Sequence, residues 1–210
     1  WAVWMEDFVI IPELTSQWTH NNTNGALSVT STGGCGSYVQ TLTGAHNDYS
    51  QVYPKVTVGN FTLASGKKAI FEAKVMVTTA GTVGLQELFV GLGTVQSGDN
   101  FIAADGATMA ADACVGFWSG PTLTTIAAVV RTADVESIQT AATTYASATQ
   151  MVLSWYFDGT SVQFYKNDVQ IAKLTAFPTT GMVPTLWIKC GNEAAAVTLT
   201  TDYILFARER

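Results

Sequence analysis

Apolar and polar residues alternate along several segments of the chain, which is the pattern of a β-strand with one buried face. The clearest case is residues 71–77. Their apolar face consists of Phe71, Ala73, Val75 and Val77. Their polar face carries Glu72 and Lys74. The alternation predicts a half-buried strand over this segment.

Other segments also favour strands. Residues 84–92 and 113–118 are short apolar runs bounded by glycine, and residues 122–131 are rich in Thr, Ile and Val. No segment has a regular apolar stripe at the 3.6-residue helical period. The Ala-rich residues 103–113 are the one candidate helix, and Gly106 weakens it.

A hairpin is predicted around Asp158-Gly159, because Asp-Gly favours a two-residue turn with positive φ at both positions. Such a turn places Trp155 opposite Val162 and Leu153 opposite Phe164. Asn167-Asp168 predicts a second tight turn, which brings Ile171 beside Phe164. Leu153, Phe164 and Ile171 then form one apolar row across three strands.

The two ends of the sequence are predicted to pair. Residues 8–11 and 203–206 are apolar on both faces, as in well-covered strands. Pairing the first strand with the last also protects two sheet edges. The prediction is an all-β fold, a two-sheet antiparallel sandwich formed by residues 1–210 as a single domain, with residues 1–5 as a candidate N-terminal arm.

Composition excludes two classes of partner. Of the 210 residues, 12% are charged and the formal net charge is −6, with no cluster of Lys and Arg. We therefore expect no nucleic-acid binding. No run of 18 apolar residues occurs and residues 1–7 lack the features of a signal peptide, so we expect no membrane anchor. A charged share of half the usual ~25% suits a surface packed against neighbouring molecules, or an exported protein.

The three cysteines, Cys35, Cys114 and Cys190, are odd in number and far apart, with no C-x-x-C spacing. They support neither a disulfide framework nor a zinc site. Cys114 and Cys190 lie in apolar segments, which predicts that both are small buried hydrophobic residues.

Several strand and turn segments together resemble a known fold family. They include Val90-Gly91-Leu92, Val115-Gly116-Phe117, residues 155–159, Pro178-Thr179-Thr180 and Asp202-Tyr203-Ile204. In this order, with residues 6–8 and 71–75 before them, they are similar to concanavalin A-like lectin and glucanase sandwiches, which are jelly rolls. More narrowly, the chain resembles virion-associated proteins of tailed bacteriophages, especially marine ones. The resemblance implies a fold but no single function, because this fold carries lectins, hydrolases and structural proteins.

Glucanases of this family carry their carboxylates in a Glu-x-Asp-x-x-Glu strand, which aims alternate side chains at one sugar bond. This motif does not occur in the sequence. Asp134 and Glu136 come nearest, and a polar turn explains them as well. Glu6 and Asp7 are adjacent, so in a strand they point to opposite faces. We therefore expect that the protein is not an enzyme and has no catalytic residue.

Nucleophilic catalysis lacks a signature as well. The two histidines, His20 and His46, lie in segments with loop composition, where exposed residues are typical. No Gly-x-Ser-x-Gly elbow marks a nucleophile.

No cofactor is expected, and calcium is the one candidate ion, since legume-type lectins of this fold hold it with loop Asp and Asn. The candidate ligand pairs are Asn47-Asp48, Asp99-Asn100 and Asn167-Asp168. The last pair is also explained as a hairpin turn, and none forms a dense acidic cluster.

Sugar binding would need an exposed aromatic platform. The candidate rings are Trp18, Trp118 and Trp187, backed by Tyr49 and Tyr53. Trp118 is the main glycan-stacking candidate because it ends a strand before Ser119-Gly120-Pro121. A large aromatic residue at a strand end also serves as a core plug.

Two functions follow, with a glucanase as a third. The first is a capsid decoration or head-surface protein on the outside of a tailed-bacteriophage virion, bound to the major capsid protein and self-associated as a homo-oligomer. Trp1 and Trp4 are its candidate interface residues, because Trp is enriched at interface hot spots. The alternative is a lectin-like carbohydrate-binding module that adheres to host glycans.

Overall fold

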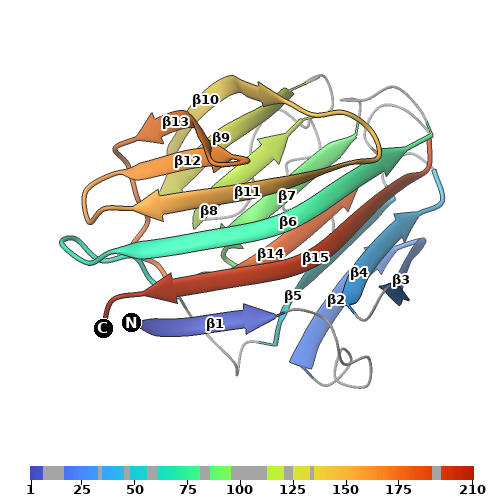
Figure 1. Ribbon diagram of the computed structural model, residues 1–210, viewed down its shortest axis with the longest axis horizontal. Coiled ribbons are helices and arrows are strands. Elements are labelled where there is room, and N and C mark those ends of the chain that lie inside the picture. Colours follow the sequence, from blue (N-terminus) through green and yellow to red (C-terminus); the bar gives the residue numbers. More distant parts are fainter. Residues whose placement is uncertain are drawn as a thin grey trace.

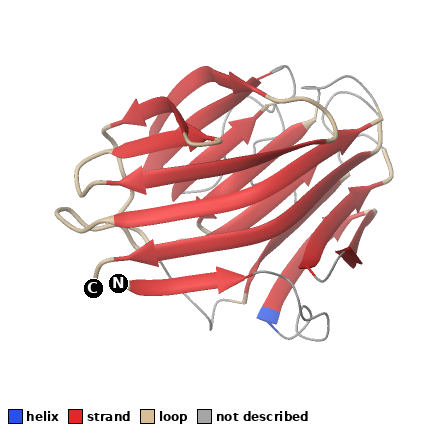
Figure 2. Cartoon of the chain, in the orientation of Figure 1, coloured by secondary structure: helices blue, strands red, loops and turns tan. Residues whose placement is uncertain are grey.

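The computed structural model describes residues 1–6, 17–32, 35–44, 48–55, 61–80, 86–95, 113–120, 125–132, 135–190 and 195–210. Every named element within these ranges is a strand. The strands are β1 (Ala2–Glu6), β2 (Trp18–Thr23), β3 (Gly25–Thr32), β4 (Cys35–Leu42), β5 (Tyr49–Pro54), β6 (Ala69–Thr79), β7 (Glu87–Gly93), β8 (Ala113–Ser119), β9 (Thr125–Thr132), β10 (Val135–Thr144), β11 (Thr149–Phe157), β12 (Val162–Lys166), β13 (Val169–Leu174), β14 (Val183–Lys189) and β15 (Val197–Arg208). The prediction of an all-β fold is confirmed, and Figure 2 shows strands through nearly all of the described chain.

The strands form two antiparallel sheets that pack as a sandwich (Figure 1). Sheet A has eight strands in the order β13-β12-β11-β6-β15-β4-β3, with β1 paired to β15. Sheet B has seven strands in the order β10-β9-β8-β7-β14-β5-β2. The long β15 pairs with β4 along its first half and with β1 along its second half.

Alternation along β6 explains why sheet A has a single buried face. Phe71, Ala73, Val75 and Val77 are buried between the sheets, while Glu72 lies on the outer face, as the sequence pattern predicts. The main hydrophobic core fills the space between the sheets, where the ring of Phe71 stacks on Trp155 at a centroid distance of 5.7 Å.

The hairpin between β11 and β12 exists, but its predicted register is wrong. Trp155 pairs with Phe164 and Leu153 with Lys166, a shift of two residues from the expected pairs. The loop contains four residues, 158–161, because the Asp158 carboxylate accepts hydrogen bonds from the backbone N–H groups of Thr160 and Ser161. A shift of two keeps each side chain on its face, so Leu153 and Phe164 are both buried in the core.

The second turn is confirmed. Asn167 and Asp168 have φ angles of 48° and 65°, and the flanking residues Lys166 and Val169 are partners. A register irregularity in β12 makes Ala172 the partner of Phe164, and Ile171 is partly buried against the core.

The first and last described strands pair, but the strand that pairs with the end of the chain is residues 2–6 rather than the predicted residues 8–11. β1 runs antiparallel to β15, with Trp4 opposite Phe206. Within the segment expected to be an arm, residues 2–5 therefore belong to a sheet, because Trp4 alternates inward onto the core. Residues 8–11 lie outside the described residues, and so does the candidate helix except for Ala113, which begins β8. No helix in the described ranges has the length and apolarity needed to cross a membrane.

Candidate functional site

Sheet B has a second hydrophobic cluster on the face turned away from the main core. It contains Tyr49, Phe89, Cys114, Trp118, Ala127, Val129 and Trp187. The neighbours of these residues along the strands, such as Leu88, Val90 and Phe117, belong to the main core. Since side chains alternate along a strand, the second cluster lies on the outer face of sheet B. Among the described strands, none forms a third layer over this face.

One row of side chains crosses this outer face at right angles to the strands. Strand pairing places Gln51 beside Trp187, Trp187 beside Phe89, and Phe89 beside Trp118. Asn21 on β2 extends the row past Gln51. The row therefore joins an aromatic platform of three rings to two amide side chains; we call it the outer-face row.

Three residues of this row have polar atoms without a hydrogen-bond partner in the described part of the chain, whereas Asn21 Nδ2 donates to the Tyr53 hydroxyl at 3.2 Å. The side-chain nitrogen and oxygen of Gln51 are buried without a hydrogen bond, and so are the indole N–H groups of Trp187 and Trp118. Buried polar groups are nearly always hydrogen-bonded, and an unmade bond costs about 1–3 kcal/mol. Such groups close together on one face have the chemistry of a site that is completed by a ligand or by water.

A row of ionisable groups runs beside the first. Strand pairing puts Lys189 between Glu87 and Tyr49, and all three residues are almost fully buried. Glu87 is the only carboxylate on this face among the strand residues whose side chains the structure describes. The row supplies a cation, an acid and a phenol that can bind hydroxyl or charged groups of a ligand.

The structure brings together most of the aromatic residues that the sequence suggested for sugar binding. Trp118, Trp187 and Tyr49 share the outer face of sheet B, and Tyr53 follows Gln51 on the same side of β5. Trp118 is therefore no plug of the main core. Trp18 belongs to the main core instead, 5.9 Å from Trp4 between ring centroids.

The prediction of a loop for His20 is wrong, because it lies in β2 with its ring half-buried. Its Nε2 is 2.9 Å from Ser50 Oγ, and Asn22 Nδ2 lies 3.2 Å from its Nδ1. Burial lowers the pKa of His20 below its usual value. This half-buried histidine orders β2 against β5. His46 lies outside the described residues.

The structure describes only part of the predicted acidic pair and the burial of two of the three cysteines. Asp134 lies outside the described residues, and the backbone of Glu136 belongs to β10, opposite Arg131. Cys114 and Cys190 are both buried, as expected. Burial raises the pKa of Cys190, which a backbone hydrogen bond from Gly44 lowers in part.

The three candidate calcium sites differ in what they contain. Asp48 is buried and accepts hydrogen bonds from Asn24 Nδ2 (3.0 Å) and Thr43 Oγ1 (3.1 Å), while Asn47 is outside the described residues. Asp99 and Asn100 are also outside them. Asn167 Oδ1 accepts a hydrogen bond from Val152 N (2.8 Å), which fits its place in a turn. Within the described ranges, no group of three His, Cys, Asp or Glu side chains is arranged to hold a metal ion.

The two candidate interface residues point in opposite directions. Trp1 is exposed, whereas Trp4 packs inward against the core near Trp18 and Phe61. Val3 and Met5 accompany Trp1 on the exposed side of β1.

Sequence reasoning missed Gln51, Phe89 and the close approach of Gly91 to Gly116. A signal for Gln51 was present, because residues 49–53 alternate Tyr-Ser-Gln-Val-Tyr and place three polar-tipped side chains on one face. The pairing of Gly91 with Gly116 depends on strand register, which these two apolar runs leave open.

No family model and no curated protein matches the sequence. Solved structures match the fold over nearly the whole chain. The endo-1,3-β-glucanase from Streptomyces sioyaensis has a TM-score of 0.63 at 10% identity, with 98% of this chain and 95% of that chain covered. The mixed linkage glucan GH16 protein of Bacteroides ovatus, in complex with a product, has a TM-score of 0.62 at 12% identity, with 97% and 99% covered. The carbohydrate recognition domain of Emp47p has a TM-score of 0.56 at 10% identity, with 90% and 87% covered.

These similarities contradict the expectation that the protein is not an enzyme, because enzymes that act on glucans share its fold from end to end. The missing Glu-x-Asp-x-x-Glu motif therefore does not exclude catalysis. None of the three structures is a virion protein, so they support the carbohydrate-related alternative better than the bacteriophage one. The chain has the concanavalin A-like jelly-roll fold that glucanases and lectin domains share.

Proposed function

We propose that the chain is a carbohydrate-binding protein that holds a glycan on the outer face of sheet B. The observation that carries this proposal is the outer-face row. Its residues Gln51, Trp187 and Trp118 combine an aromatic platform with buried polar atoms that have no hydrogen-bond partner where the structure describes the chain. Sugar rings stack on aromatic faces through their C–H groups, and their hydroxyls supply both donors and acceptors. A saccharide therefore matches both halves of the row.

The fold supports the same proposal. A glucanase and a lectin carbohydrate recognition domain share it, and both classes take saccharides as ligands. Lys189, Glu87 and Tyr49 lie next to the row and supply further polar contacts.

Gln51 and Trp187 are both 0% exposed, so a glycan can reach them only after the outer face of sheet B becomes accessible. Binding that requires such a change has an association rate constant below the usual range of about 10⁵–10⁷ M⁻¹s⁻¹. Slow association is therefore the expected kinetic signature.

The test is titration of the chain with β-glucan, mannan and uronan oligosaccharides, followed by calorimetry and tryptophan fluorescence. We expect one class of oligosaccharide to bind. Gln51→Ala and Trp187→Phe should each raise its Kd by about tenfold, which corresponds to the free energy of one or two lost hydrogen bonds. Trp155→Phe is the matched control, because it removes another buried, unpartnered indole N–H, but from the core between the sheets. Equal losses in Trp155→Phe and Trp187→Phe, or no binding to any oligosaccharide, would overturn the proposal.

Attachment to the outside of a bacteriophage head, through the major capsid protein or a second copy of the chain, is a second candidate function. It is favoured by three exposed apolar side chains on β1 and just before it: Trp1 (57% exposed), Val3 (65%) and Met5 (55%). Contiguous apolar surface of this kind marks an interaction site. Sedimentation of the chain alone and with purified capsids tests this candidate. A variant with Trp1→Ser, Val3→Thr and Met5→Gln should lose association, while Val169→Thr, at an equally exposed valine, should keep it.

A further inference from the structure

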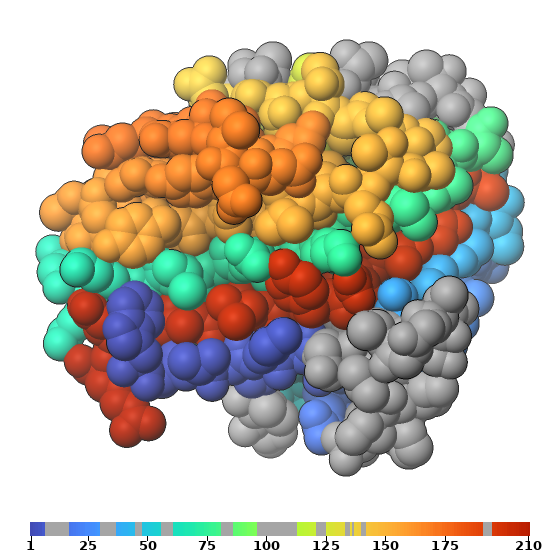
Figure 3. Space-filling view, in the orientation of Figure 1, coloured from blue at the N-terminus to red at the C-terminus, as the bar shows by residue number. Residues whose placement is uncertain are grey.

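The outer face of sheet A, on the opposite side of the sandwich, contains a groove of about 290 Å³ (Figure 3 shows this face). Its lining includes Glu72, Ser154, Tyr156, Tyr165, Asp168 and Leu205. The volume lies near the lower end of the ~300–1,000 Å³ typical of ligand sites, so the groove fits a small ligand group.

The groove forms because a small residue lies among large ones. Strand pairing places Ser154 on β11 between Glu72 on β6 and Tyr165 on β12. Tyr156, two residues further along β11, stands on the same face. The short Ser154 side chain leaves a hollow that the Tyr156 and Tyr165 rings border. The Tyr165 hydroxyl donates to Gln163 Oε1 (2.9 Å), which restricts the orientation of its ring.

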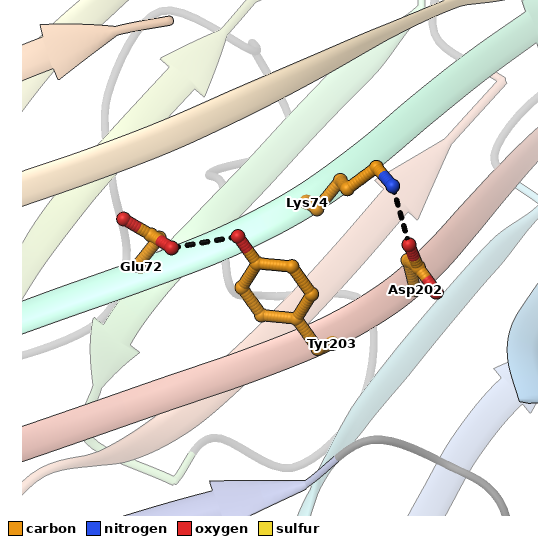
Figure 4. Close-up of polar contacts among 4 residues, drawn as sticks. All are labelled: Glu72, Lys74, Asp202 and Tyr203. Carbon is orange, nitrogen blue, oxygen red and sulfur yellow. Dashed lines mark hydrogen bonds and ion pairs between the residues drawn. The ribbon is translucent and has the colours of Figure 1, made fainter. Parts of the chain in front are cut away.

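The charges around the groove are negative. Tyr203 donates its hydroxyl to Glu72 Oε1 at 2.6 Å and so holds the carboxylate in place (Figure 4). Asp168 contributes a second carboxylate, and no Lys or Arg is among the lining residues. Lys74, the neighbouring cation on β6, points along the sheet to Asp202 and pairs with it at 2.7 Å (Figure 4). Its charge is thereby offset outside the groove.

We propose that this groove binds a protonated amine that is part of a small molecule or of a short side chain. A cation over tyrosine faces is attracted by their negative π-surface, and nearby carboxylates add charge-assisted hydrogen bonds. The two carboxylates Glu72 and Asp168 lie beside two tyrosine rings, and this combination suits an ammonium group better than a neutral ring. The amine could belong to an amino sugar or to an alkylammonium side chain, and the experiment below separates the two sources.

This site is independent of the outer-face row on sheet B, because the two lie on opposite outer faces of the sandwich. Either site can therefore fail its test while the other passes.

The experiment uses the full chain and three probes: glucosamine, glucose and n-butylammonium, each titrated at low salt and followed by NMR chemical shifts. Glucosamine and glucose have the same ring and differ at one position, so the comparison isolates the amine. We expect glucosamine to shift resonances of Tyr156 and Tyr165 and glucose to leave them unchanged. Tighter binding of glucosamine than of butylammonium would assign an amino sugar, and the reverse would assign an alkylammonium group.

Three variants locate the site. Glu72→Gln keeps an acceptor for the Tyr203 hydroxyl but removes the charge, and it should weaken amine binding by about tenfold. Tyr165→Ser, on a strand near the sheet edge, should weaken it as well. Glu209→Gln makes the same charge change away from the groove and should bind like the wild type. Equal affinity for glucose and glucosamine, or full amine binding in Glu72→Gln, would overturn the proposal.

Discussion

Gly91 on β7 and Gly116 on β8 are direct partners whose backbones lie so close that neither position has room for a side chain. A Cβ atom on Gly116 would lie 2.5 Å from Val90 O, and one on Gly91 would lie 2.3 Å from Val115 O. The ring of Phe89 covers the pair, with its Cζ 2.9 Å from the Cβ position of Gly116. The ring of Phe89, at the centre of the outer-face row, therefore packs directly on the backbone of the two glycines.

We predict that Gly116→Ala destabilises the protein by about 1–3 kcal/mol, the usual cost of overpacking, because the clashing atoms are backbone that cannot rotate away. Urea unfolding measures this loss. Gly25→Ala is the control, since the atoms nearest to its Cβ position, Leu42 Cδ2, Asn22 Cβ and Tyr49 O, lie further away, at 3.1, 3.2 and 3.3 Å. A Gly116→Ala variant as stable as Gly25→Ala would show that β7 and β8 are further apart than described.

Gln51 should lower the stability of the protein, because its amide is fully buried and has no hydrogen-bond partner among the described residues. We predict that Gln51→Leu stabilises the chain by about 1 kcal/mol while it weakens glycan binding. Gln40 is the matched control: it is equally buried on β4, but its Nε2 donates to Ser50 O and Ser50 Oγ at 3.0 and 2.9 Å. Gln40→Leu should therefore destabilise. Thermal unfolding of both variants decides the point, and a destabilised Gln51→Leu would mean that its amide has partners in solution.

Local pattern was enough for β6 and for the positions of the turns after β11 and β12, but not for β2, for strand register or for the site. The alternation in residues 71–77 fixed which face of β6 is buried, because one-residue slips would expose four apolar side chains. Around Asp158-Gly159 the same argument identified the face but missed the register. The dipeptide favours a two-residue loop, and the hydrogen bonds to the Asp158 carboxylate stabilise a longer one.

The outer face of sheet B was harder to predict because strands buried on both faces show no alternation. β7, β8 and β14 are buried throughout, so their sequences read as continuous apolar runs. Trp118 and Trp187 could be recognised as candidate rings from their residue type alone. Their meeting with Gln51 depends on the order β8-β7-β14-β5, which joins segments far apart in the sequence.

Leu153 and Phe164 are fully buried on the inner face of sheet A, and Phe164 meets the ring of Phe117 edge-on at 5.5 Å between centroids. Leu153→Ala and Phe164→Ala should each destabilise the protein by about 2–5 kcal/mol, the cost of a cavity in a packed core. Val169→Ala, at an exposed site in the same meander, should change stability by less than about 0.5 kcal/mol. Urea melts compare the three. If both core variants lost less than about 0.5 kcal/mol of stability, Leu153 and Phe164 would not lie on the buried face of sheet A.

The Asp158 carboxylate is the centre of the β11–β12 loop. Its Oδ1 accepts from Thr160 N, Thr160 Oγ1 and Ser161 N at 2.8, 2.8 and 2.7 Å, and its Oδ2 accepts from Ser161 Oγ at 2.8 Å. These hydrogen bonds, above all that from the Ser161 side chain, lower the pKa of Asp158 below its ordinary value. They bind the ionised form, so the loop is held most firmly when the carboxylate is charged.

A carboxyl group whose pKa is lower in the folded chain than in the unfolded chain adds stability above its unfolded pKa of about 3.9. That contribution is lost as the pH falls below this value toward the folded pKa. We therefore predict that Asp158→Asn is less stable than the wild type at about pH 7, and that the difference shrinks between about pH 5 and pH 2. Thr160→Val, which removes one hydroxyl donor, should show a smaller change in the same direction. Urea unfolding of the three proteins across this pH range is the measurement. A difference between Asp158→Asn and the wild type that stays constant from neutral to acid pH would show that the loop does not depend on the ionised carboxylate.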